Sequence, residues 1–296
     1  MKTLTHFFLA SAFAAGATAH GQTPRPSSIA LSTGVRMSYV EHGPASGHPV
    51  IFIHGYSDSW FSYSRVLPLL PPDVRGFALS LRGHGDSDRP ASGYAMRDLA
   101  ADVVAFMDAK RIVRATIVGH SMGSLVAQQV ALAAPRRVSG IVLIGAARSI
   151  RHFAGVDDLK QVIDQLADPV PVEFIREFQE STVTVPVPPE FMKAVIAESA
   201  KLPLRVWRDL LAGMLATTEA TPLSRAGIPA LVLRGEKDTY APAAEQDSLR
   251  ALLGGAKFKE YAATGHAPHW ERPAEFVADL QAFLAGRRDV AGGRRD

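Results

Sequence analysis

Short apolar runs alternate with longer amphipathic stretches through most of the chain. The first two candidates for strands, Ser28–Ser32 and Val35–His42, resemble an opening β-hairpin. Five mostly apolar runs and one final, more polar candidate follow: 50–53, 76–80, 115–118, 140–144, 230–233 and 258–262. Because apolar runs without polar alternation are typical of strands buried on both faces, the pattern predicts a parallel sheet.

Helical patterns occupy the stretches between these predicted strands. They are Asp98–Lys110, Met122–Ala134, Ala243–Leu253 and Pro273–Leu284, and a proline suits the first turn of the last helix. Strands that alternate with helices in this way form sheets with helices on both faces. The chain is therefore predicted to be an α/β protein with a doubly wound, mostly parallel sheet of eight strands.

The alternation stops between residues 147 and 220, where four segments have a helical pattern and no strand is predicted. An insertion that leaves the sheet after one strand and returns before the next predicts a helical cap. It would lie over the carboxyl ends of the strands, where open α/β sheets bind ligands. We thus predict a core of residues 28–146 and 221–286, a cap of residues 147–220 and a flexible tail of residues 287–296.

The N-terminus has the pattern of a cleavable signal peptide. Lys2 is followed by an apolar run from Phe7 to Ala15 and then by Ala17-Thr18-Ala19, and no acidic residue precedes Glu41. The apolar run is too short to span a bilayer. We predict that residues 1–19 direct export to the periplasm or the exterior, with cleavage near Ala19 and no stable membrane anchor.

Composition narrows the function classes. The net charge of +3 is small for 296 residues and the basic side chains are scattered, so no nucleic-acid partner is expected. The chain has no cysteine, which excludes disulfides, thiolate metal sites and a cysteine nucleophile. Its histidines lack the paired helical spacing of metal-binding motifs, so no metal is expected.

The segment Gly119-His120-Ser121-Met122-Gly123 lies between a predicted strand and a predicted helix. A serine on such a tight turn has its hydroxyl clear above the sheet, and the flanking glycines keep side chains out of the turn. The N-terminus of the following helix favours developing negative charge. Ser121 is therefore the predicted nucleophile.

A serine hydroxyl requires a base that takes its proton, and the base requires an acid that orients it. His266, in the loop after the last predicted strand, is the predicted base, with His269 as the alternative. Asp238, which follows the strand at 230–233, is the predicted acid, with Glu236 as the alternative. The order Ser, Asp, His along the chain is the one found where the nucleophile sits on such a turn.

Two backbone N–H groups are expected to stabilise an oxyanion. One is that of Met122, directly after the nucleophile, and the other is that of Tyr56, in the loop after the strand at 50–53. His54 is expected to brace that loop. The aromatic candidates for a substrate-binding pocket are Trp60, Phe153 and Trp207, with packing in the interior as the alternative for each.

These landmarks resemble those of the α/β-hydrolase superfamily over nearly the whole chain after the leader. They are His54-Gly55, the turn Arg82–Ser87, the segment Gly119–Gly123, Gly235 with Asp238, and Gly265-His266. The capped esterases, lactonases and C–C bond hydrolases look most similar. Epoxide hydrolases and haloalkane dehalogenases of this superfamily place an aspartate where this chain has Ser121.

The resemblance implies a cofactor-independent hydrolase that works through an acyl-enzyme and acts on a small ester-like molecule. A carboxylic ester or a lactone is the expected substrate. A C–C bond hydrolase of a diketone-type substrate is one alternative, and a non-catalytic small-molecule binding module of the same fold is another.

Overall fold

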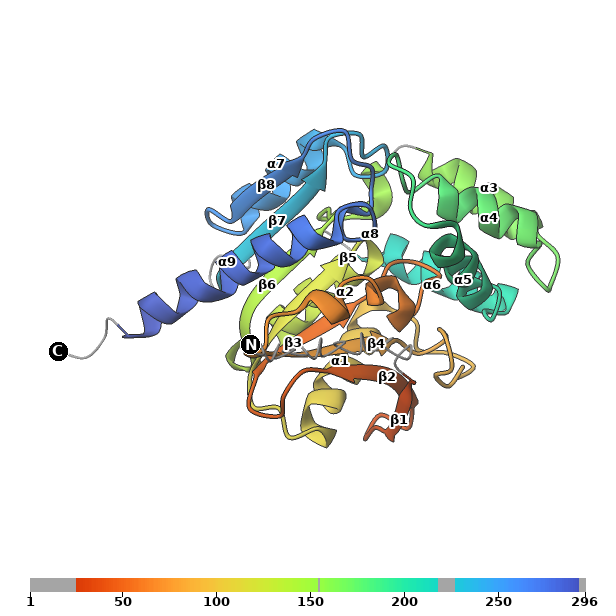
Figure 1. The fold of residues 1–296 in the computed structure, drawn as a ribbon. Coiled ribbons are helices and arrows are strands. Elements are labelled where there is room, and N and C mark those ends of the chain that lie inside the picture. Colours follow the sequence, from red (N-terminus) through yellow and green to blue (C-terminus); the bar gives the residue numbers. More distant parts are fainter. Residues whose placement is uncertain (1–24, 154, 218–226, 293–296) are drawn as a thin grey trace, which may run out of the picture.

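The computed structural model describes residues 25–292, except residues 154 and 218–226. The predicted signal peptide of residues 1–19 lies outside this part. Eight strands form a single sheet in the order β1-β2-β4-β3-β5-β6-β7-β8 (Figure 1). The strands are β1 (Ser27–Ala30), β2 (Arg36–His42), β3 (His48–Ile53), β4 (Val74–Ser80), β5 (Ala115–His120), β6 (Val138–Ile144), β7 (Ala230–Gly235) and β8 (Lys257–Tyr261).

The direction of the strands confirms the predicted mostly parallel sheet. Strand β2 is antiparallel to both of its neighbours, β1 and β4. From β4 through β8 every neighbouring pair is parallel. Parallel neighbours require crossover connections, and the helices that make them cover the sheet.

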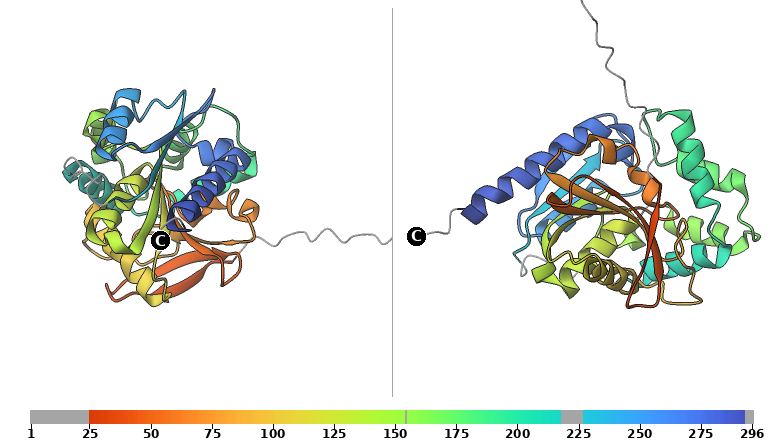
Figure 2. Two further views of the ribbon diagram at one scale, coloured as in Figure 1. Left: turned by 90° about the vertical axis from the view of Figure 1, so that its left-hand side faces the viewer. Right: turned by 60° about the horizontal axis from the view of Figure 1, so that its bottom comes forward.

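Helices lie on both faces of the sheet (Figure 2). One face is covered by α1 (Met96–Ala109), α2 (Met122–Ala133) and α7 (Ala243–Leu252). The other is covered by α9 (Pro273–Gly292) and two 3-10 turns, η1 (Trp60–Tyr63) and η2 (Leu67–Leu69). Three short elements complete the core and its borders: η3 (Pro135–Arg137), η4 (Ile150–His152) and α8 (Pro268–Glu271).

Alternate side chains of β3 enter two separate hydrophobic clusters. Ile51 and Ile53 belong to the cluster beneath α1 and α2, whereas Val50 and Phe52 belong to the cluster beneath α9. All four are fully buried. Burying one such side chain stabilises the fold by about 1.5–3 kcal/mol, so both faces of the central strands hold the sheet in place.

The last helix is longer than the sequence indicated. It ends at Gly292, whereas the helical pattern was followed only to Leu284 and residues 287–296 were predicted to be a flexible tail. Residues 287–292 are therefore helical, and residues 293–296 lie outside the described part of the chain. Alanine and arginine are strong helix formers, which explains the extension despite two nearby glycines.

Among the described residues between β6 and β7, four α-helices follow η4 in the segment for which the sequence predicts a cap. They are α3 (Val156–Gln165), α4 (Val172–Glu180), α5 (Pro189–Ser199) and α6 (Leu204–Ala216), and no strand occurs among the described residues of this segment. They stand together at one end of the sheet, apart from the helices on its faces (Figure 1). Trp207 and Leu210 of α6 are fully buried beneath them.

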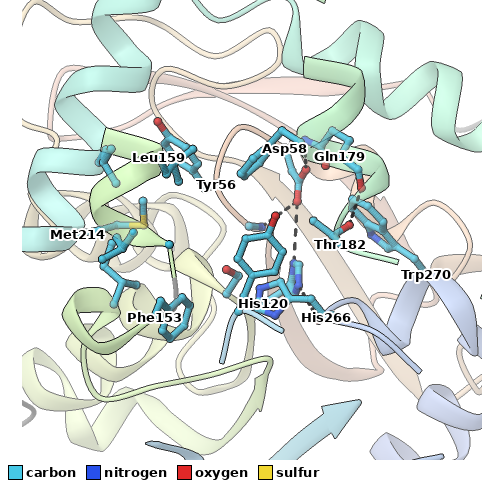
Figure 3. A pocket seen from close by; sticks show the side chains of 18 residues that line it. Tyr56, Asp58, His120, Phe153, Leu159, Gln179, Thr182, Met214, His266 and Trp270 are labelled. Carbon is cyan, nitrogen blue, oxygen red and sulfur yellow. Dashed lines mark hydrogen bonds and ion pairs between the residues drawn. The ribbon is translucent and has the colours of Figure 1, made fainter. Parts of the chain in front are cut away.

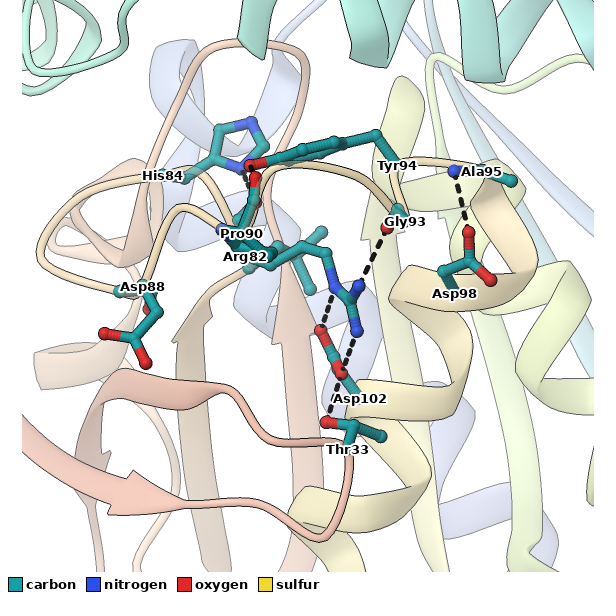
Figure 4. A network of polar contacts seen from close by, with 12 residues as sticks. Thr33, Arg82, His84, Asp88, Pro90, Gly93, Tyr94, Ala95, Asp98 and Asp102 are labelled. Atoms are coloured by element: carbon teal, nitrogen blue, oxygen red, sulfur yellow. Dashed lines mark hydrogen bonds and ion pairs between the residues drawn. The ribbon is translucent and has the colours of Figure 1, made fainter.

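A buried ion pair ties the loop after β4 to α1 (Figure 4). The guanidinium of Arg82 donates from Nε and Nη2 to the two carboxylate oxygens of Asp102, both at 2.6 Å. It also donates to the carbonyl oxygen of Gly93 at 2.9 Å. Asp102 is fully buried and accepts a further hydrogen bond of 2.6 Å from Thr33. One carboxylate thus joins the opening hairpin, α1 and the loop after β4.

Replacing Arg82 by Met should lower the free energy of unfolding by about 3–5 kcal/mol, because it leaves the buried Asp102 carboxylate without its cation. The double variant R82M/D102L should regain part of that loss, since both charges are then removed. Urea unfolding of the three proteins measures the effect. Equal stability of R82M and the unmodified chain would contradict a structural role for this pair.

Candidate active site

Ser121 lies at the turn between β5 and α2, in a backbone conformation that residues other than glycine rarely adopt. Its φ is 50° and its ψ is −115°. Its N–H donates to the carbonyl oxygen of Ile144, at the end of the neighbouring strand β6, at 2.9 Å. Strained residues of this kind persist only where their surroundings hold them, and they cluster at functional sites.

The two glycines of the turn are required by close packing. A Cβ on Gly119 would lie 2.1 Å from the carbonyl oxygen of Gly123, and a Cβ on Gly123 would lie 2.4 Å from that of Ile53. Real Cβ atoms do not approach backbone so closely. The glycines therefore allow α2 to pack directly against β5 and β3, which presents Ser121 at the carboxyl end of the sheet.

His266 is held by the carboxylate of Asp238. Its Nδ1 lies 2.9 Å from both carboxylate oxygens. Asp238 in turn accepts hydrogen bonds from the N–H groups of Tyr240 at 2.9 Å and Ala241 at 3.1 Å. Burial acts to raise the pKa of Asp238, but the charge of His266 and these donors outweigh it and lower the pKa below its usual value. Asp238 is therefore ionised when Nδ1 donates to it.

The two alternatives from the sequence have other partners. Glu236 accepts a hydrogen bond from the N–H of Ala263 at 2.8 Å and pairs with Lys237. His269 is fully buried, and its Nε2 lies 3.2 Å from the hydroxyl of Ser62. In this geometry the carboxylate that contacts His266 is that of Asp238.

Gly145 is a feature of the site that sequence reasoning missed. It follows β6 with a φ of +52°, and a Cβ there would lie 2.7 Å from Cε1 of His266. The imidazole thus rests against bare backbone. The sequence Ile144-Gly145-Ala146 carries only a weak signal, because a glycine after a strand is equally compatible with an ordinary turn.

Four other histidines surround the site and are buried: His54, His84, His120 and His269. Burial lowers the pKa of each, to about 4 for His54 and about 3 for His269. They are therefore uncharged at neutral pH. His54 donates from Nδ1 to Gly55 at 2.8 Å and accepts at Nε2 from Leu81 at 3.1 Å, so it braces the loop after β3 as expected.

The backbone places both predicted oxyanion donors near Ser121. Met122 is the first residue of α2, where N–H groups lack an acceptor within the helix. Tyr56 follows β3 and lines the same pocket as Ser121 and His266. Its phenol hydroxyl donates to the carbonyl oxygen of Trp207 at 2.7 Å, which links this loop to cap helix α6.

Ser121, His266 and Tyr56 open into a cavity of about 320 Å³ between the sheet and the cap. Figure 3 shows that its two sides differ in polarity: Phe153, Leu159 and Met214 gather on one side, and Asp58, Gln179 and Thr182 on the other. The cavity can hold a small molecule with an apolar portion and a polar portion.

Of the three aromatic candidates for this pocket, only Phe153 lines it. Trp60 instead packs in the cluster beneath α9. Trp207 is fully buried and stands edge-on behind the ring of Tyr56, with centroids 5.1 Å apart. The prediction of Trp60 and Trp207 as lining residues is therefore corrected, because large aromatic side chains fill hydrophobic cores as readily as they line pockets.

Asp58 is a buried carboxyl group in the pocket that sequence reasoning missed. Its Oδ1 accepts from Nε2 of Gln179 at 3.0 Å, its Oδ2 accepts from the N–H of Gly55 at 3.2 Å, and Oδ2 lies 3.9 Å from Nδ1 of His120. Burial raises the pKa of Asp58 to about 7, although these donors and the charge of His266 act to lower it. Near neutral pH a large fraction of Asp58 therefore carries a proton.

Comparison with known proteins identifies the family. The alpha/beta hydrolase fold family matches residues 48–273. A non-heme chloroperoxidase from Streptomyces lividans is 30% identical over 86% of this chain and 98% of its own length. A 2-hydroxymuconate semialdehyde hydrolase from Pseudomonas sp. (strain CF600) is 28% identical over 86% of this chain and 92% of its own.

A solved esterase from Rhodococcus sp. ECU1013 superimposes with a TM-score of 0.76, at 27% identity over 89% of this chain and 99% of that chain. The chain therefore belongs to the alpha/beta hydrolase fold family. Within the described residues, no group of three acidic or histidine side chains has an arrangement that could hold a metal ion. No described helix is both long enough and apolar enough to cross a bilayer.

The pH dependence of stability should reveal the proton on Asp58. Because the pKa is about 7 in the folded chain and 3.8 is its usual value, the folded chain keeps a proton that the unfolded chain loses. This group therefore reduces stability progressively as the pH rises from about 4 to about 7. From pH 5 to pH 8, the titration of Asp58 should lower the free energy of unfolding of the unmodified chain by on the order of 3 kcal/mol. D58N has no such group and should not show this decrease.

Urea unfolding of both proteins at the two pH values measures this difference. Each protein is compared with itself at pH 5, so any constant effect of the substitution cancels. The same loss in both proteins would show that Asp58 does not titrate in this range.

Proposed function

We propose that the protein is a serine hydrolase that cleaves carboxylic ester or lactone bonds through an acyl-enzyme. The observation that carries the proposal is the pairing of His266 with Asp238 at 2.9 Å, in a pocket that Ser121 also lines from a strained strand-to-helix turn. Chemistry of this kind needs a nucleophile, a base and an acid that orients the base.

The reaction follows from the protonation states. With Nδ1–H donated to Asp238, Nε2 of His266 is free to take the proton of Ser121 as Oγ attacks the carbonyl carbon. The oxyanion is stabilised by the N–H groups of Met122 and Tyr56. His266 then gives its proton to the leaving alcohol, and the same base activates the water that releases the acid and restores Ser121.

The pocket supports a small or medium-sized substrate with an apolar portion. Its volume of about 320 Å³ and the apolar side chains of Phe153, Leu159 and Met214 suit an acyl chain or an apolar alcohol. The similarity to the Rhodococcus esterase over 89% of the chain supports ester hydrolysis.

A C–C bond hydrolase of a diketone-type substrate is the second candidate. It is favoured by the similarity to 2-hydroxymuconate semialdehyde hydrolase over 86% of the chain. The sequence of residues 1–19 supports export, which would separate the protein from cytoplasmic catabolism of such substrates. We propose on the same basis that the mature protein works in the periplasm or outside the cell.

Replacing Ser121 by Ala should lower kcat for p-nitrophenyl esters by roughly 10⁴–10⁶-fold, because the nucleophile is removed. A fluorophosphonate probe should label the unmodified chain at Ser121 and leave S121A unlabelled, as read by peptide mass spectrometry. S124A is the matched control, since Ser124 is a buried serine in the first turn of the helix that follows Ser121, and it should keep both activity and labelling.

Substantial ester hydrolysis by S121A would overturn the proposal. Failure of the unmodified chain to react with the probe would instead favour a non-catalytic binding module. An assay of a ring-fission diketone beside the p-nitrophenyl esters distinguishes the two candidate functions. A C–C bond hydrolase would cleave the diketone faster than the esters.

A further inference from the structure

The loop that carries the predicted oxyanion donor Tyr56 contains a second strained residue. Ser57 has a φ of 63°, in the left-handed region that residues with side chains rarely adopt. It is fully buried, and it directly follows Tyr56, whose own N–H lies in the peptide group between Gly55 and Tyr56. The direction of that N–H therefore depends on the contacts that hold the turn on both sides of Tyr56, at Gly55 and at Ser57.

Two polar side chains hold this turn. From within the loop, Asp58 accepts the N–H of Gly55 at 3.2 Å. From the cap, Nε2 of Gln179 lies 3.1 Å from the hydroxyl oxygen of Ser57 and 3.0 Å from Oδ1 of Asp58. Gln179 is at the end of α4 and is only 1% exposed. Its Nε2 also lies 2.9 Å from the hydroxyl oxygen of Ser199 in α5, so its two N–H groups are shared among three buried acceptors, two in the loop and one in the cap.

The same end of α4 also holds the loop of the catalytic histidine. The N–H of His266 donates to the carbonyl oxygen of Thr182 at 2.8 Å, and the hydroxyl of Thr182 donates to the carbonyl oxygen of Gln179 at 2.7 Å. Glu271 extends this connection, since it accepts from the N–H groups of Gly265 at 2.8 Å and Val185 at 2.6 Å. One short segment of the cap thus contacts two loops of the site.

We propose that Gln179 is a positioning residue for catalysis: its side-chain amide fixes the turn Tyr56–Asp58 and so aims the Tyr56 N–H at the oxyanion. The cap is then part of the catalytic apparatus as well as a wall of the pocket. This inference rests on the proposed function. It assigns a role in the reaction to Gln179, which lies 121 residues along the chain from its partner Asp58.

The chemistry of the contact requires a neutral donor. Asp58 is faced by Gln179 from the cap, by the N–H of Gly55 from its own loop, and by His120 and His266 from the other side of the pocket. An ionised carboxylate in place of the amide would stand next to Asp58 and could not donate to it. A protonated carboxylic acid at the same position could still donate one hydrogen bond.

The first test is Q179M, which keeps the length of the side chain and removes its donor. We expect kcat for a p-nitrophenyl ester to fall about 10- to 100-fold with KM within about 3-fold, because a misdirected oxyanion donor weakens the transition state more than the bound substrate. Q128M is the matched control: Gln128 is another buried glutamine whose amide donates to two carbonyl oxygens, in α2 and away from the pocket lining. It should lower thermal stability and leave kcat within about 3-fold.

The second test is Q179E, read as the ratio of its kcat to that of the unmodified chain from pH 5 to pH 8. The ratio should be highest at pH 5, where the new carboxyl group is protonated and can donate, and should fall at least about 10-fold towards pH 8. Taking the ratio removes any pH dependence that is common to both proteins. A role in folding alone would not produce such a profile.

The inference is overturned if Q179M lowers kcat no more than Q128M, or if the Q179E ratio is independent of pH. These outcomes differ from failure of the proposed function, which would appear as an inactive unmodified chain or an active S121A. If Q179M does not fold, the pH profile of Q179E decides the question.

Discussion

The site depends on one constraint: at the turn around Ser121 the backbone of α2 packs directly against the backbones of β5 and β3. A Cβ on Gly119 would lie only 2.1 Å from the carbonyl oxygen of Gly123, and a Cβ on Gly123 only 2.4 Å from that of Ile53, so neither position can carry a side chain. This packing brings the N-terminus of α2 to the middle of the sheet, next to the carboxyl ends of β3 and β6. The strained Ser121 is held there by the burial of the whole α2 interface, which a surface loop could not supply.

Parallel strands then bring distant residues to the same place. Tyr56 follows β3, Asp238 follows β7 and His266 follows β8, and the carboxyl ends of these strands face the same end of the sheet. Loops that follow neighbouring strands of one rigid sheet are held in place well enough to keep a contact such as the 2.9 Å between Nδ1 of His266 and Asp238. The cap lies over this end and closes the pocket with side chains of its own.

The sequence predicts the parts of this arrangement that local rules determine. Apolar runs predict parallel strands, and the glycines around Ser121 predict its turn, because each depends on residues within a few positions. The contact of Gln179 with Asp58 could not be predicted, since it depends on how cap helices dock on the sheet. Trp60 and Trp207 were wrongly predicted to line the pocket for a related reason: the sequence around an aromatic residue does not distinguish a place in the core from a place in a pocket wall. Helix α9 continues past Leu284 because helix propensity overrides the turn signal of its glycines.

The charges of the buried carboxyl groups and histidines are the last property on which the site depends. In the proposed reaction, any negative charge on Asp58 would oppose the oxyanion that develops near Tyr56, because Asp58 belongs to the same loop and lines the same pocket. Burial raises the pKa of Asp58 to about 7 and lowers the pKa values of the surrounding histidines, so these groups carry little charge in slightly acidic solution. The ionised carboxylate beside His266 is then Asp238, which contacts its Nδ1. Burial thus suppresses a negative charge on Asp58, where it would oppose the proposed reaction. Asp238 stays ionised in spite of its burial, because the charge of His266 and the backbone donors outweigh it.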